Sequence, residues 1–276
     1  MYKALNYWVY GGFSGEKTPY EFIDFAAAQG LDGIEMTVGD CIKIDITQEE
    51  CAKIAAYAAS KKIGLRTMAT GFYWGCSLSS PDEAERAQAV EFTRKYIQIA
   101  NWLGVETILV IPGDTRVPWD ESRPVVSYKN AWANATASIK ELLPVAEKLN
   151  VNIALENVWN RFLVTPLEMK YFIDEVNSEY IGSYFDAGNV FPNGLPEEWI
   201  KVLGNRIKKV HIKDFHVGTK NFCDLLTGSL DFDAVMKALS EIGYDDFVTA
   251  EMGQYRVHND VMLAHTSMAM DKIMGR

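Results

Sequence analysis

The sequence predicts one α/β domain, a single (β/α)8 TIM barrel that spans residues 1–276. Eight apolar, strand-like runs alternate with segments of helical periodicity or helix-start chemistry. Such alternation is typical of a parallel sheet with helical crossovers. Eight units in 276 residues fit a closed barrel better than an open sheet. Neither a linker nor a shift of composition marks a second domain.

The expected strands share a short apolar core. They are residues 3–10, 31–38, 63–70, 105–113, 151–157, 181–188, 207–215 and 245–252. Three of the segments between them carry serine or threonine directly before proline, and this pair favours the start of a helix. Proline has no backbone N–H, and in the first turn of a helix that N–H would have no hydrogen-bond partner in any case. These pairs are Thr18 with Pro19, Ser79 or Ser80 with Pro81, and Thr165 with Pro166. Gly30 and Gly104 are the expected stops of the helices that begin near Pro19 and Pro81.

Composition excludes several classes of protein. With 48% hydrophobic and 12% aromatic residues the chain has ample material for a core. Its formal charge of -10, without a basic block, argues against a nucleic-acid partner. No secretion signal or membrane span is apparent. The four cysteines form no C-x-x-C pair, so we expect reduced thiols in a cytoplasmic protein with no membrane partner.

Four consecutive expected strands end with side chains that bind metals. They are Glu156, Asp186, His211 and Glu251. Taken singly, each has an ordinary interpretation: a solvated acid or helix cap, a turn residue, or a hydrogen-bonded core histidine. Together, they would converge at the carboxyl ends of the strands, where TIM barrels build active sites. Three carboxylates alone would repel one another, and a divalent cation removes that conflict. Oxygen ligands with one imidazole suit Mn²⁺ or Mg²⁺, with Co²⁺ and Zn²⁺ as alternatives.

Two long irregular stretches follow expected strands at the same end. We expect loops 113–126 and 216–230 to form the substrate pocket at the mouth of the barrel. The aromatic residues on that side are expected to form its wall, although they could equally be packing residues; they are Trp8, Phe13, Phe72, Trp74 and Trp119.

The segments "ALENVWNRF", "YFDAGNV", "VHIKDF" and "TAEMG" resemble, in order and spacing, the xylose-isomerase-like TIM-barrel superfamily. The likeness is greatest to its sugar phosphate isomerase/epimerase branch, which includes ketose 3-epimerases and L-ribulose or L-xylulose 5-phosphate 3-epimerases. The resemblance implies that Glu156, Asp186, His211 and Glu251 hold one metal ion. It also implies that Glu156 and Glu251 act as base and acid in proton abstraction next to a ketose carbonyl, through a metal-stabilised enediolate.

Two positions depart from the free-ketose epimerases. Asn189 stands where those enzymes have a histidine, and Val217 stands where they have an arginine. Asn189 instead matches the D-x-G-N form of the pentulose-phosphate epimerases. Lys213, in H-x-K-D, is either a substrate contact or an ion-pair partner of Asp214.

Phosphate recognition is open because no phosphate-binding glycine loop follows a strand. Arg116, Arg123 and Arg161 could bind a phosphate or form surface ion pairs. The expected partner is therefore a small carbohydrate or sugar phosphate, and a homo-oligomer is compatible with the sequence.

Other functions share parts of this pattern. A sugar or cyclitol dehydratase would use the same metal cage and the same first proton abstraction, and a catalytically inactive sugar-binding barrel would keep only the pocket. Apurinic endonucleases share the fold but hold several zinc ions with many histidines, whereas this chain has four histidines in total.

Overall fold

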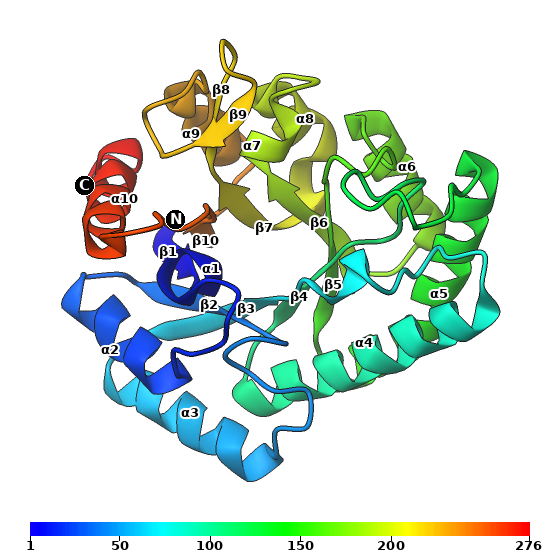
Figure 1. The fold of residues 1–276 in the computed structure, drawn as a ribbon, viewed down its shortest axis with the longest axis horizontal. Helices are drawn as coiled ribbons and strands as arrows, with labels where there is room; N and C mark the ends of the chain where they lie inside the picture. Colours follow the sequence, from blue (N-terminus) through cyan, green and yellow to red (C-terminus); the bar gives the residue numbers. More distant parts are fainter.

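The computed structural model describes residues 1–276 and forms a closed barrel of eight parallel strands surrounded by helices (Figure 1). This confirms the predicted (β/α)8 fold. The barrel strands are β1 (Tyr2–Asn6), β2 (Gly33–Thr37), β3 (Gly64–Ala69), β4 (Thr107–Val110), β5 (Asn152–Glu156), β6 (Ile181–Asp186), β7 (Ile207–Ile212) and β10 (Phe247–Ala250). Each strand pairs with its neighbours in chain order, and β1 pairs with β10 to close the ring.

The helices pack against the outside of the barrel. The longer ones are α2 (Pro19–Ala28), α3 (Gln48–Ser60), α4 (Glu83–Leu103), α5 (Tyr128–Leu149), α6 (Pro166–Val176), α8 (Pro196–Leu203), α9 (Phe232–Glu241) and α10 (Asn259–Ile273). Shorter turns are α1 (Tyr7–Gly11), α7 (Ala187–Val190), η1 (Phe72–Trp74) and η2 (Gly204–Arg206). None of the helices combines the length and apolar character needed to span a lipid bilayer.

Local sequence signals fix several helix ends. Thr18 caps α2 as predicted, and it forms a reciprocal pair of hydrogen bonds with Glu21. Thr165 caps α6 in the same way with Glu168. Gly104 ends α4 in the left-handed conformation, which glycine adopts without steric cost. These contacts satisfy backbone groups that a helix end leaves unpaired.

Two predicted boundaries were wrong. The strand expected over residues 3–10 ends at Asn6, because the Asn6 side chain accepts a hydrogen bond from Trp8 N–H and starts α1. The apolar residues that follow are buried on that helix instead. Helix α4 is capped by Asp82 and not by Ser79 or Ser80. Ser79 bonds to the backbone of Asp114, and Ser80 donates to Glu85.

A hairpin stands outside the barrel within the loop that follows β7. Strands β8 (Asp214–His216) and β9 (Asn221–Cys223) pair in antiparallel fashion, and Figure 1 shows them beside α9, away from the barrel strands. The buried Asp214 carboxylate accepts hydrogen bonds from four backbone N–H groups, those of Phe215, Gly228, Ser229 and Leu230. Asp214 therefore anchors this loop and does not pair with Lys213.

Candidate metal centre

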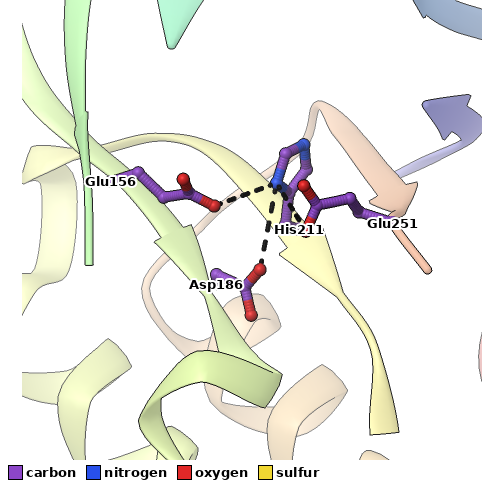
Figure 2. A group of neighbouring side chains, drawn as sticks. All are labelled: Glu156, Asp186, His211 and Glu251. Carbon is purple, nitrogen blue, oxygen red and sulfur yellow. Dashed lines mark hydrogen bonds and ion pairs between the residues drawn. The ribbon is translucent and has the colours of Figure 1, made fainter. Parts of the chain in front are cut away.

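The four side chains predicted at the strand ends lie together inside the mouth of the barrel (Figure 2). Glu156 and Asp186 are the last residues of β5 and β6, His211 is the penultimate residue of β7, and Glu251 directly follows β10. One potential ligand atom from each lies within 4.8 Å of those of the other three. Barrel geometry thus brings together residues that are up to 95 positions apart (251 − 156).

The His211 imidazole forms the centre of this cluster. Its Nδ1 atom lies 3.4 Å from Oε1 of Glu156, 3.9 Å from Oδ2 of Asp186 and 3.8 Å from Oε2 of Glu251. His211 and Asp186 occupy partner positions in the ladder between β6 and β7. Both side chains are completely buried. The cluster is therefore an interior site and not a solvated group of acids.

Neighbouring side chains hold Asp186 in place. Its backbone N–H donates to Oδ1 of Asn157 (3.0 Å), and its carbonyl accepts from Nδ2 of the same asparagine (2.9 Å). Oδ1 of Asp186 accepts the N–H of Asn189 at 2.7 Å and so caps α7. Oδ2, in contrast, is buried, faces the cluster and forms no hydrogen bond. The aspartate thus turns one oxygen, which accepts no hydrogen bond, toward the other three residues.

Lys213 supplies the nearest positive charge. Its Nζ lies 2.8 Å from Oδ2 of Asp186 and forms an ion pair with it. It also donates a hydrogen bond to Glu251. These contacts place Lys213 within the cluster, and they exclude the ion pair with Asp214 that the sequence left open.

The carboxylates differ in their electrostatic surroundings. Burial raises the pKa of Glu156 to about 7, although the hydrogen bond with His211 opposes that rise. Burial also raises the pKa of Asp186 above its ordinary value. For Glu251, burial is outweighed by the charges of Lys213 and His211, which hold its pKa below the ordinary value. The two glutamates therefore differ in proton affinity in the metal-free protein.

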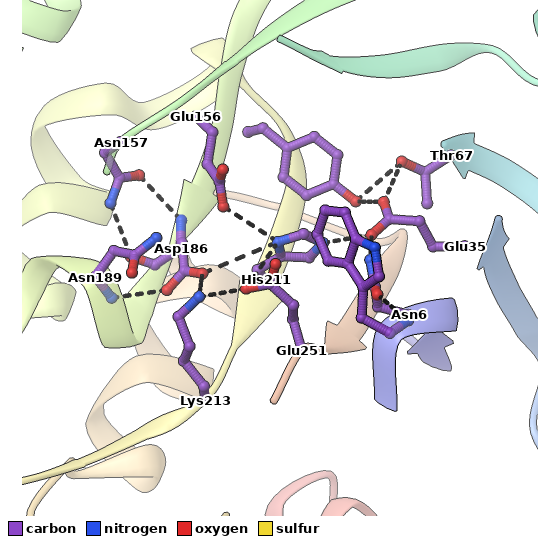
Figure 3. Close-up of polar contacts among 12 residues, drawn as sticks. Asn6, Glu35, Thr67, Glu156, Asn157, Asp186, Asn189, His211, Lys213 and Glu251 are labelled. Carbon is purple, nitrogen blue, oxygen red and sulfur yellow. Dashed lines mark hydrogen bonds and ion pairs between the residues drawn. The ribbon is translucent and has the colours of Figure 1, made fainter. Parts of the chain in front are cut away.

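Glu35 is a fourth carboxylate beside His211, and the sequence did not predict it. Glu35 of β2 is fully buried, and its Oε1 lies 2.6 Å from Nε2 of His211 (Figure 3). The available signal was a single acid, Glu35, within the otherwise uncharged stretch "GIEMTV". It could not be connected to His211 because β2 and β7 are not neighbours in the barrel.

A cavity of about 350 Å³ adjoins the cluster at the mouth of the barrel. It is lined by Trp8, Phe13, Trp159, Lys213, Phe222, Cys223, Asp224, Glu251, Met252, Gly253 and Gln254. The predicted loop 216–230 therefore contributes to the wall, whereas loop 113–126 does not. The remaining wall comes from residues after β1, β5 and β10 and from Lys213, which directly follows β7. A larger hollow of about 830 Å³ lies at the opposite end of the barrel, near Asn152 and Ile181, and contains none of the four cluster residues.

Most of the other predicted substrate contacts lie outside this cavity. Arg116 pairs with Glu121 at 3.6 Å, and Arg123 pairs with Glu85 at 2.5 Å. Arg161 is exposed. Asn189 lines a separate small cavity together with Asn157 and Trp199. Of this predicted set, only Lys213 reaches the cavity wall.

Trp119 is connected to the cavity through another tryptophan. Its ring centroid lies 5.0 Å from that of Trp159 and 4.4 Å from that of Trp74. Trp159 itself lines the cavity. The predicted aromatic wall is therefore present, but Trp119 forms its outer layer.

Residues 23–271 match the family model described as "Xylose isomerase-like TIM barrel". The chain belongs to this family. An L-ribulose-5-phosphate 3-epimerase of Salmonella paratyphi B is 23% identical over 262 residues, which cover 93% of this chain and 89% of the relative. An uncharacterised protein of Methanocaldococcus jannaschii is 27% identical over 179 residues, 63% of this chain and 59% of that protein.

Solved structures of two other proteins share the fold of this chain. D-psicose 3-epimerase from Clostridium cellulolyticum H10, solved with D-tagatose, superposes with a TM-score of 0.84 and 19% identity, covering 100% of this chain and 99% of that one. The IOLI protein, solved with a bound zinc atom, gives a TM-score of 0.80 at 19% identity, with 100% and 98% covered. At these identities the structural likeness shows the fold alone.

Proposed function

We propose that this protein is a divalent-metal-dependent ketose 3-epimerase. The observation that carries the proposal is the convergence of Glu156, Asp186, His211 and Glu251 beside the cavity at the barrel mouth. The epimerase names of the L-ribulose-5-phosphate relative and the D-psicose structure support the reaction class.

The residues fit a divalent cation by their own chemistry. Three carboxylates and one imidazole offer oxygen and nitrogen ligands within 4.8 Å of one another. Oδ2 of Asp186 is buried without a hydrogen bond, and the Lys213 ammonium at 2.8 Å balances its charge, so this oxygen is available to a cation that enters the cluster. This donor set suits Mn²⁺ or Mg²⁺, with Co²⁺ or Zn²⁺ as alternatives. When bound, such an ion would supply positive charge that stabilises the oxygens of an enediolate.

The two glutamates supply the proton chemistry. Glu156 at the end of β5 and Glu251 after β10 approach the cluster from different strands (Figure 2). One carboxylate removes the proton from C3, next to the ketose carbonyl, and the other returns a proton to the opposite face of that carbon. In the reverse reaction the two exchange roles. Lys213, on the cavity wall, would donate hydrogen bonds to substrate oxygens.

The lining of the cavity favours a neutral ketose over a ketose phosphate. Trp8, Phe13, Trp159 and Phe222 present aromatic surface that can pack on the C–H face of a sugar. The charged groups in the wall are Lys213, Asp224 and Glu251, and the lysine is already paired with carboxylates. A phosphate dianion would meet more negative than positive charge there. Arg116 and Arg161 remain predictions for phosphate contacts.

Hydrogen exchange in D₂O tests the proposal. The protein is incubated with Mn²⁺ and a panel of free ketoses, pentulose 5-phosphates and hexulose 6-phosphates, and the products are analysed by NMR. We expect C3 epimers carrying deuterium at C3, with the highest kcat/KM for a free ketose and loss of turnover in EDTA. Release of water with formation of an unsaturated product would instead identify a dehydratase. Absence of exchange throughout the panel in metal-loaded protein would favour the inactive sugar-binding barrel.

A further inference from the structure

We propose that Glu35 is the positioning residue of the metal centre, because it fixes which nitrogen of His211 faces the ligand cluster. The inference rests on the proposed metal centre. Oε1 of Glu35 lies 2.6 Å from Nε2 of His211, on the side of the ring opposite the cluster (Figure 3). Nδ1 of the same ring faces Glu156, Asp186 and Glu251. Both side chains are completely buried.

The hydrogen-bond pattern assigns the proton on the imidazole. An ionised carboxylate only accepts hydrogen bonds, so Nε2 of His211 must be the donor in this contact. In a neutral imidazole with a proton on Nε2, the lone pair lies on Nδ1. That lone pair then points at the carboxylates of the cluster. A carboxylate in this place also raises the basicity of the imidazole and thereby its strength as a ligand.

Glu35 is itself fixed on both of its oxygens. Oε1 also accepts a hydrogen bond from Nδ2 of Asn6 at 2.6 Å. Oε2 accepts from Oγ1 of Thr67 at 2.9 Å and from the hydroxyl of Tyr184. With four donors the carboxylate has little freedom to rotate. The two oxygens therefore divide their contacts: Oε1 holds His211, whereas Oε2 fastens Glu35 to the barrel interior.

Packing restrains the plane of the imidazole as well. The ring of Tyr184 lies 4.4 Å from the ring of His211, centroid to centroid, at an interplanar angle of 54°. Asn6 is fixed in turn, because its Oδ1 accepts the N–H of Trp8 at 2.7 Å. The orientation of His211 thus depends on side chains from β1, β2, β3 and β6, on the far side of the ring from the ligands.

Metal affinity and the histidine tautomer provide the test. Metal-stripped wild type, Glu35→Gln, Glu35→Leu and Thr93→Val are titrated with Mn²⁺ by calorimetry, and the thermal midpoint of each metal-free protein is measured. Thr93→Val is the control, because it removes a buried hydrogen bond between α4 and Tyr73 and leaves Glu35, its hydrogen-bond partners and His211 unchanged. We expect affinity near that of wild type for Thr93→Val. Loss of a residue that hydrogen-bonds to a metal ligand typically weakens metal binding by about 10–100-fold. We expect the loss in Glu35→Gln to lie near the lower limit, because the amide oxygen can still accept a hydrogen bond from Nε2 of His211. Glu35→Leu should lie near the upper limit.

A spectroscopic reading separates positioning from a purely structural role and does not depend on Glu35→Leu folding. In ¹⁵N NMR of the Zn²⁺-loaded wild type, His211 should carry its proton on Nε2. A proton on Nδ1, or unchanged Mn²⁺ affinity in Glu35→Gln together with a lowered thermal midpoint, would overturn the positioning role alone. Wild-type protein that binds no Mn²⁺ or Zn²⁺ would overturn the proposed metal centre, and the role of Glu35 with it.

Discussion

The Lys213 ammonium group lies 2.8 Å from Oδ2 of Asp186, within a cluster that also holds Glu156, His211 and Glu251. It donates to Glu251 as well. Lys213 is mostly buried, so its charge is poorly screened by water. One cation thus balances two carboxylates that would otherwise be buried close together without a partner.

Removing the positive charge of Lys213 should destabilise the metal-free protein. Breaking a buried ion pair from one side leaves an uncompensated charge, and for Lys213→Met we expect a loss on the order of 3 kcal/mol in the free energy of unfolding. Urea unfolding in EDTA measures that loss. Mn²⁺ should raise the thermal midpoint more in Lys213→Met than in wild type, because the ion replaces the missing charge. Lys208→Met, which loses an exposed contact with the Glu179 carbonyl, is the control; equal Mn²⁺ shifts in Lys213→Met and wild type would refute the argument.

Replacing either glutamate should abolish most turnover while the fold is retained. Glu156→Gln and Glu251→Gln keep the size and one oxygen but remove the proton acceptor, and loss of a general base typically costs about 10²–10⁴ in rate. If one glutamate serves each face, each variant should still exchange the C3 hydrogen of only one epimer with D₂O. Glu49→Gln, on the surface of α3, should behave as wild type. Near-normal epimerisation by both active-site variants would exclude the two-carboxylate mechanism.

The loss of folding stability at acidic pH should depend in part on Glu85. This carboxylate accepts hydrogen bonds from Arg123 (2.5 Å), Ser77 N–H (2.7 Å) and Ser80 (2.9 Å). Burial raises its pKa, but the hydrogen bonds and the charge of Arg123 outweigh burial and hold the pKa below the ordinary value.

A carboxylate with a lowered folded pKa stabilises the protein above its unfolded pKa of about 4.3 and loses that contribution as the pH falls through the folded pKa. Urea unfolding between pH 3 and pH 7 should therefore show a shallower acid decline for Glu85→Gln than for wild type. Glu83→Gln, a nearly fully exposed residue of the same helix, should keep the wild-type slope. Identical slopes for all three proteins would contradict the role of Glu85.

The barrel and its four converging residues could be predicted because both depend on local patterns. Apolar runs mark buried strands whatever their partners, and the rule that parallel strands end on one side places Glu156, Asp186, His211 and Glu251 together. The end of β1 was harder to predict, because Tyr7, Trp8 and Val9 are as apolar as strand residues although they are buried on a helix. A short apolar run does not distinguish these two conformations.

Contacts across the barrel could not be read from the sequence. Glu35 reaches His211 from β2, a strand that does not pair with β7, so strand order alone does not connect them. The sequence also placed loop 113–126 in the cavity wall together with Trp8 and Phe13, but of these only Trp8 and Phe13 line the cavity. These features depend on side-chain direction and loop conformation, which periodicity does not report.

Anomalous diffraction from crystals soaked in Mn²⁺ is the most direct test of the metal centre. We predict one anomalous peak per chain, within bonding distance of Glu156, Asp186, His211 and Glu251 and on the Nδ1 side of the imidazole. The same peak should be absent from Asp186→Ala crystals. A wild-type map with no peak at these four residues, or with the only ordered ion elsewhere, would contradict the account.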